Sequence, residues 1–167
     1  LASEFPDGVW LCELAPVSDP EAIWDTLAAS LKEAGLISLH MPALGGLRKA
    51  RKDSINNGWR NASFRGYADF MQTEEFQRAL EELMAYGTDM KTAIMCAEAV
   101  PWRCHRSLIA DALAVAGWRV LHIQSRKTAR VHRRTPFLKV RRGRLLYPAS
   151  ARQVAPSGLA STPAGGT

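Results

Sequence analysis

The sequence predicts an α/β fold in which helices flank a mainly parallel sheet. The clearest observation is an alternation of patterns: an apolar run at 92–96, a helical pattern at 105–116 and a second apolar run at 119–123. A strand that returns through a helix to a second strand favours parallel pairing with a right-handed crossover. A chain of 167 residues is also long enough to bury one core, so we expect a single domain over 1–148.

The first part of the chain is expected to contribute two strands and a helix. The short apolar runs at 9–14 and 36–41 are typical of strands. Between them, Ser18 and Glu21 fit a capping box, and apolar residues at helical spacing predict a helix that ends at Gly35. The long stretch 43–63 is predicted to be irregular, which in a compact domain is often a functional segment.

Two more helices and a last strand follow. Helices are predicted at 64–72 and from Thr73 to Tyr86, because Thr73 is a good cap and two glutamates come directly after it. The basic segment 126–144 is expected to be irregular and to lead into a strand at 144–147. Residues 149–167 are rich in Ala, Ser, Pro and Gly, so we expect a flexible tail.

Charge is distributed unevenly along the chain, whose net charge is +6. Residues 1–102 hold nine Lys and Arg against fifteen Asp and Glu, whereas residues 103–167 hold thirteen against one. The basic half is therefore where an anionic partner is expected, unless it only solvates the surface. Nonspecific contact of 126–144 with nucleic-acid phosphates is one alternative, since we find no helix-turn-helix, zinc-finger or RNA-recognition pattern there.

Composition favours a cytoplasmic protein without a membrane partner. No apolar run approaches the ~20 residues that a membrane-spanning helix needs. No basic and apolar leader is recognisable at the start of the sequence. The chain has three cysteines, an odd number that argues against a disulfide framework.

The strongest chemical signal lies between the predicted strand at 92–96 and the predicted helix at 105–116. Cys96 ends the strand, and Cys104, His105 and Arg106 stand at the start of the helix. Ligands of open α/β sheets bind beyond the carboxyl ends of the strands. A helix start offers free N–H groups and a positive dipole end, which favour an anion and lower the pKa of a nearby thiol.

The leading hypothesis is a small anion-binding protein with a cysteine site, and an enzyme acting on a phosphorylated or otherwise anionic small molecule is one form of it that the residues leave open. Cys96 would be the nucleophile or redox thiol, with Cys104 as an alternative, and Glu98 and His105 would handle protons. Arg106 would anchor the anion through its planar guanidinium. The residues assign no cofactor.

Three other interpretations of this segment stay open. A metal ion could be bound by Cys96, Cys104, His105 and a distant His40, although seven residues between the cysteines is not a common zinc spacing. The loop could bind an anion without catalysis. It could also be purely structural, because cysteine is among the most frequently buried residues.

Further candidates for ligand binding lie upstream. Gly45 and Gly46, followed by Arg48 and other basic residues, could form a flap that closes over an anion. Trp59 and Tyr67 could stack on a base, although aromatic residues at this spacing more often belong to the core. His40 is a further candidate because it lies at the end of its predicted strand.

The block from Met95 to Trp118, with its Cys-Ala-Glu and Cys-His-Arg groups, closely resembles the bacterial and archaeal family called domain of unknown function 488. The segments 40–46, 57–67 and 132–137 are similar to other blocks of that family. The resemblance implies a three-layer, Rossmann-like α/β fold and gives no reaction.

The resemblance runs from about Trp24 to Pro148. Residues 1–23 lack the Thr-Ile-Gly-His-Ser-like and Val-Asp-Val-Arg-like blocks with which members of the family usually begin. The N-terminal part is therefore expected to be divergent or truncated. If those blocks contribute to the site, the protein is expected to be inactive.

Overall fold

The computed structural model describes residues 20–96, 104–125 and 127–149. The chain forms four α-helices and one short 3-10 helix in these ranges: α1 (Pro20–Glu33), η1 (Pro42–Leu44), α2 (Ala62–Phe70), α3 (Glu74–Asp89) and α4 (Arg106–Val115). The strands of the same ranges are β1 (Leu121–Ser125), β2 (Thr128–Val131), β3 (Lys139–Arg141) and β4 (Arg144–Leu146). A mixed α/β composition is thus confirmed, and every predicted helix is present, with ends that differ by a few residues.

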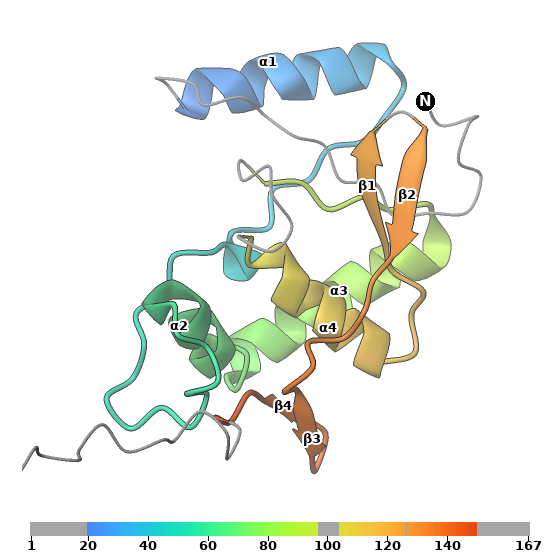
Figure 1. Ribbon diagram of the computed structural model, residues 1–167. Coiled ribbons are helices and arrows are strands. Elements are labelled where there is room, and N and C mark those ends of the chain that lie inside the picture. The colour runs from blue at the N-terminus through green and yellow to red at the C-terminus, as the bar shows by residue number, and fades with distance from the viewer. Residues whose placement is uncertain (1–19, 97–103, 126, 150–167) are drawn as a thin grey trace, which may run out of the picture.

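The strands that the structure describes pair antiparallel. β1 pairs with β2, so that Leu121 lies opposite Val131, and β3 pairs with β4, so that Lys139 lies opposite Leu146. These two hairpins form separate two-stranded sheets (Figure 1). The mainly parallel, three-layer Rossmann-like sheet expected from the sequence is therefore not shown.

The difference has an identifiable physical source. The predicted strands at 36–41 and 92–96 belong to neither hairpin, and 9–14 lies outside the described residues. Short apolar runs fit a strand and an extended segment outside any sheet equally well, so periodicity cannot separate the two. β1 instead pairs with the segment that follows it in the chain, and such local pairing closes only a short loop.

The core lies around α2, α3 and α4, and α4 packs against α3 (Figure 1). Tyr67 from α2, Phe76 from α3 and Leu108 from α4 are each at most 1% exposed. Tyr147, which follows β4, is fully buried in the same core. The apolar positions of three helices and one strand end therefore converge on a single interior.

Side-chain caps explain where the two central helices begin. The Asn61 side chain accepts a hydrogen bond from the backbone N–H of Ser63 at 2.8 Å, at the start of α2. Thr73 accepts one from the N–H of Phe76 at 3.3 Å, at the start of α3. Such caps satisfy N–H groups that have no partner within the helix.

The long irregular segment before α2 is anchored on one buried carboxylate. Asp69 of α2 accepts hydrogen bonds from the Ser54 hydroxyl at 2.6 Å, the Asn56 amide at 2.8 Å and the Arg51 backbone N–H at 2.9 Å. A buried carboxylate that accepts several hydrogen bonds is well compensated for its loss of water. These three hydrogen bonds hold the irregular segment against α2.

Two expectations concern the C-terminal tail and membrane-spanning helices. Of the predicted tail at 149–167, only Ala149 lies within the described residues. Within the described ranges no helix combines the length and the apolar character that crossing a membrane requires.

Candidate functional site

Two cysteines that are eight positions apart in the sequence meet beside the start of α4. The Cys96 Sγ lies 2.9 Å from the Cys104 Sγ, and neither forms a disulfide. Cys104 is buried, with 1% of its surface exposed, and Cys96 is half-buried. A disulfide bond would be about 2.05 Å long, so this contact is a hydrogen bond between two cysteine sulfurs.

Arg106 contacts the sulfur of Cys104 through its side chain and its backbone N–H. Its Nε donates a hydrogen bond to the Cys104 Sγ at 3.0 Å, and its backbone N–H approaches the same sulfur at 3.4 Å. The arginine itself is only 3% exposed. A guanidinium held in this way favours a negatively charged sulfur, because a charge-assisted hydrogen bond is stronger where water is excluded.

These neighbours lower the pKa of the Cys104 thiol from 9.0 to about 4. The hydrogen bond with Cys96 is the largest cause, and burial acts against it; the hydrogen bond with His105, the Arg106 N–H and the Arg106 charge lower the pKa further. Cys104 is therefore a thiolate at neutral pH, which is the nucleophilic form of cysteine.

His105 stands next to this thiolate in a space bounded by Gly46 and Tyr67. Its Nδ1 lies 3.9 Å from the Cys104 Sγ, and its ring centroid lies 5.0 Å from that of Tyr67. A Cβ atom added at Gly46 would come within 2.7 Å of the His105 Nδ1. Gly46 thus leaves room for the imidazole, and the Tyr67 hydroxyl donates to the Leu44 carbonyl oxygen at 2.8 Å.

Arg48 is half-buried and packs against Phe70 of α2. Its guanidinium is 4.0 Å above the Phe70 ring, and its Nη2 donates to the Pro42 carbonyl oxygen at 3.5 Å. Burial raises the pKa of Tyr67, the charge of Arg48 opposes that rise, and the two cysteines add to it. The charges of Arg48 and of the cysteine pair therefore both act on the same phenol.

Gly45 closes the η1 turn, with its N–H donating to the Pro42 oxygen at 2.9 Å.

Three of the predicted site residues are not brought to the cysteine pair by the described structure. Trp59 packs in an aromatic cluster, with ring centroids 4.8 Å from Phe64 and 5.0 Å from Phe137. His40 is exposed in the extended segment before η1. Glu98 lies outside the described residues.

The same cluster offers donor atoms for a metal ion. One atom each from Cys96, Cys104 and His105 lie within 4.8 Å of one another. Two thiolates and an imidazole suit a soft ion such as zinc and would leave one position open. The buried guanidinium of Arg106, 3.0 Å from the Cys104 sulfur, works against an added cation and favours an anion.

A second polar cluster, which the sequence interpretation missed, is centred on Asp111 of α4. Its Oδ1 accepts hydrogen bonds from the His132 Nε2 and the Thr135 N–H, both at 2.9 Å, and its Oδ2 accepts one from the Tyr147 hydroxyl at 3.0 Å. The other ring nitrogen of His132 lies 2.8 Å from the His122 Nε2. The available signal was an acidic residue within the apolar pattern of the helix, where a charge needs buried partners.

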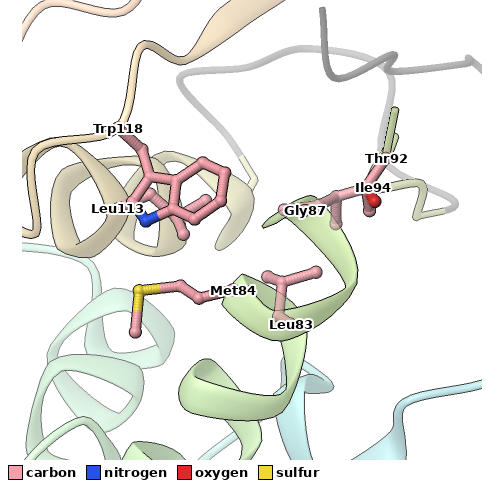
Figure 2. A pocket seen from close by; sticks show the side chains of 7 residues that line it. All are labelled: Leu83, Met84, Gly87, Thr92, Ile94, Leu113 and Trp118. Carbon is pink, nitrogen blue, oxygen red and sulfur yellow. The ribbon is translucent and has the colours of Figure 1, made fainter. Parts of the chain in front are cut away.

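A pocket between α3 and α4 is distinct from both clusters. Figure 2 shows the side chains that line it: Leu83, Met84, Gly87, Thr92, Ile94, Leu113 and Trp118. None of these residues is ionisable, so the pocket offers no group for acid–base or nucleophilic chemistry. The cysteine pair therefore remains the candidate site.

Comparison with models of protein families identifies a match. The family model described as Domain of unknown function DUF488 matches residues 9–113, a range that begins before Trp24 and ends before the similar segment at 132–137. It includes Cys96, Cys104 and Arg106. Neither the curated proteins nor the solved structures include a match to this chain. Because the family model covers more than half of the 167 residues, the chain belongs to the family Domain of unknown function DUF488.

Proposed function

We propose that this protein binds a small anionic molecule at Cys104 and acts on it as a thiol-dependent enzyme. The observation that carries the proposal is the buried contact of 3.0 Å between the Arg106 Nε and the Cys104 Sγ. An arginine in this position stabilises both a thiolate and an arriving phosphate or carboxylate. A phosphorylated metabolite is the substrate class that best fits this combination.

The proposal gives the nucleophilic role to Cys104 and a supporting role to Cys96. Cys104 has the lowered pKa, while Cys96 supplies the hydrogen bond that contributes most to it. His105, with its Nδ1 3.9 Å from the Cys104 sulfur, is the nearest group that can hand a proton to a leaving group. Glu98 keeps its proposed part in proton handling on the basis of the sequence alone.

Chemical protection of Cys104 tests the proposed site. The full chain is treated with iodoacetamide at neutral pH, and alkylation of each cysteine is followed by mass spectrometry as inorganic phosphate is added. Phosphate should slow alkylation of Cys104 in the native protein and should have little effect in Arg106→Gln. The matched control is Arg119→Gln, which removes an exposed arginine and should preserve the protection. Alkylation that phosphate never slows would refute the anion site.

Metal binding is the competing use of the same side chains. The purified protein can be incubated with zinc, dialysed and analysed for bound metal. Retention of one equivalent of zinc, lost in Cys96→Ser and in Cys104→Ser, would replace the anion-binding proposal by a metal site. We expect no stoichiometric retention, because the Arg106 charge opposes a cation at the sulfur.

A second candidate function is nonspecific binding of nucleic acid by the β3–β4 hairpin. The hairpin carries four exposed basic residues: Lys139, Arg141, Arg142 and Arg144. Clustered cations of this kind bind phosphate backbones with an affinity that falls steeply with salt. Binding to a DNA duplex at low salt, weakened by Arg141→Gln with Arg142→Gln, is the expected result, and no binding at low salt would exclude this function.

A further inference from the structure

The sulfurs of Cys96 and Cys104 lie close enough to form a bond with each other. They are 2.9 Å apart, and neither belongs to a disulfide. A disulfide would need the two atoms to approach by only about 0.9 Å more, because its bond is about 2.05 Å long. Each sulfur is therefore already in contact with any group that forms on the other.

The two sulfurs differ in burial and in charge. Cys104 is 1% exposed, and its sulfur accepts the hydrogen bond of 3.0 Å from the Arg106 Nε that stabilises a thiolate. Cys96 is half-buried, and it is the S–H donor of the sulfur contact because a thiolate has no proton to donate. Oxidants react with thiolates in preference to thiols, so Cys104 is the sulfur that is oxidised first.

Cys96 is the group best placed to capture an oxidised Cys104. Its sulfur, at 2.9 Å, is nearer to the Cys104 Sγ than the Arg106 Nε at 3.0 Å or the His105 Nδ1 at 3.9 Å. Of these three groups, the thiol is the one that forms a stable bond with a sulfenic sulfur. An oxidised Cys104 is consequently expected to end as a disulfide and not as a sulfinic acid.

We propose that Cys104 and Cys96 form a reversible oxidation site for a small hydroperoxide, with Cys104 as the sulfur that is oxidised and Cys96 as the resolving thiol. Because Cys104 is 1% exposed, an oxidant of the size of hydrogen peroxide suits the site better than a bulky disulfide. The inference rests on the proposed function for the thiolate of Cys104. It adds a regulation to that function, since oxidation consumes the nucleophile and reduction restores it.

The oxidation takes place in two steps. In the first, the Cys104 thiolate forms an S–O bond with one oxygen of hydrogen peroxide, the O–O bond breaks and hydroxide leaves. In the second, the Cys96 sulfur attacks the sulfenic sulfur of Cys104, so that the S–S bond forms as the S–O bond breaks. The departing hydroxide takes the Cys96 proton and becomes water. Each disulfide formed thus reduces one peroxide, and an added thiol opens the disulfide again by exchange.

Treatment of the reduced native chain with one equivalent of hydrogen peroxide tests the proposal. The number of free thiols, counted after denaturation, should fall from three to one, and dithiothreitol should restore all three. Trypsin cleaves at Arg103, between the two cysteines, so mass spectrometry without reduction should find residues 92–103 linked to residues 104–106. Three remaining thiols, or a link that involves Cys12 in place of either sulfur, would overturn the inference.

Three single variants assign the roles of the cysteines. Cys12→Ser is the matched control and should form the same disulfide as the native chain. In Cys96→Ser, Cys104 should be captured as a sulfenic acid by dimedone, whereas Cys96 in Cys104→Ser should be captured much less. Capture of Cys96 but not of Cys104 would overturn the assigned order of attack. The peptide map of the native chain decides the proposal even if a variant fails to fold.

The failure of this inference can be distinguished from the failure of the proposed function. Phosphate protection of Cys104 is measured on the reduced protein, and disulfide formation needs no anion. A disulfide in a protein that phosphate never protects would refute the anion site and leave the oxidation site standing. Phosphate protection in a protein that forms no disulfide would do the reverse.

Discussion

Cys104 is a buried sulfur that carries a negative charge because its neighbours replace the water it has lost. Cys96 and Arg106 both direct hydrogen bonds to it, at 2.9 Å and 3.0 Å. Burial alone would raise the pKa of a thiol. The pKa of Cys104 is lowered instead, because these contacts stabilise the thiolate by more than the loss of water destabilises it. At Asp111, three hydrogen-bond donors compensate one buried carboxylate for the water it has lost.

Removal of the Asp111 carboxylate should be among the most damaging single changes in this chain. Asp111→Ala leaves the donors on His132, Thr135 and Tyr147 without their acceptor, and we expect a loss of about 3 kcal/mol or more in the free energy of unfolding. Tyr147→Phe removes only one of these contacts and should cost about 1 kcal/mol. Urea unfolding of both variants measures the difference. A loss in Asp111→Ala no larger than that in Tyr147→Phe would show that the cluster does not stabilise the fold.

At the scale of elements, the loop before α2 crosses this helix at a very short distance, at Gly66. Gly66 of α2 lies against the backbone of Arg48 and Ala50, and a Cβ atom at Gly66 would come within 2.7 Å of the Ala50 nitrogen. Backbone atoms cannot move aside as a flexible side chain does. The helix and the loop that carries Arg48 therefore fit together only with glycine at this position.

Gly66→Ala should consequently destabilise the protein although alanine is the better helix former. Intrinsic propensity alone would stabilise α2 by about 1 kcal/mol, whereas the overlap with the loop should cost about 1–3 kcal/mol more than that gain. Ser63→Ala, an exposed change in the same helix, is the control for propensity. Thermal unfolding that shows a higher midpoint for Gly66→Ala would contradict the close crossing.

The elements also show what could be predicted from the sequence. The cap at Thr73 and apolar positions at helical spacing are local signals, and the helices follow them. Sheet pairing depends on which segments meet in space, and the apolar run at 36–41 carries no information about its partner. Cys96, Cys104 and Arg106 lie within eleven residues of one another in the sequence, which made one shared site a natural prediction, and the structure places the two sulfurs 2.9 Å apart. The contacts of Asp111 with His132 and Tyr147 join segments that no local pattern connects.

At the scale of the whole molecule, two titrating groups make stability depend on pH in the same direction. The pKa of Cys104 is lower in the folded chain, so the unfolded chain binds the proton between about pH 4 and the ordinary value of 9.0. The pKa of His122 is lowered from 6.5, so the unfolded chain also takes up that proton first as the pH falls. The unfolded state binds more protons in both cases, and stability must rise with pH.

The urea midpoint should therefore be higher at about pH 8 than at about pH 5. Cys104→Ser should remove a large part of this slope, because serine does not titrate in this range, and His122→Phe should remove a further part at the acidic end. A midpoint that is independent of pH in the native protein would contradict both assigned directions.

The central claim is that Cys104 is a thiolate at neutral pH, and its ionisation can be measured directly. The rate of Cys104 alkylation by iodoacetamide, followed by mass spectrometry from acid to alkaline pH, reports the thiolate fraction. We predict a midpoint near pH 4 and an almost constant rate above pH 6, with a higher midpoint in Cys96→Ser and in Arg106→Gln. A midpoint near the ordinary thiol value of about 8.5 in the native protein would contradict the account.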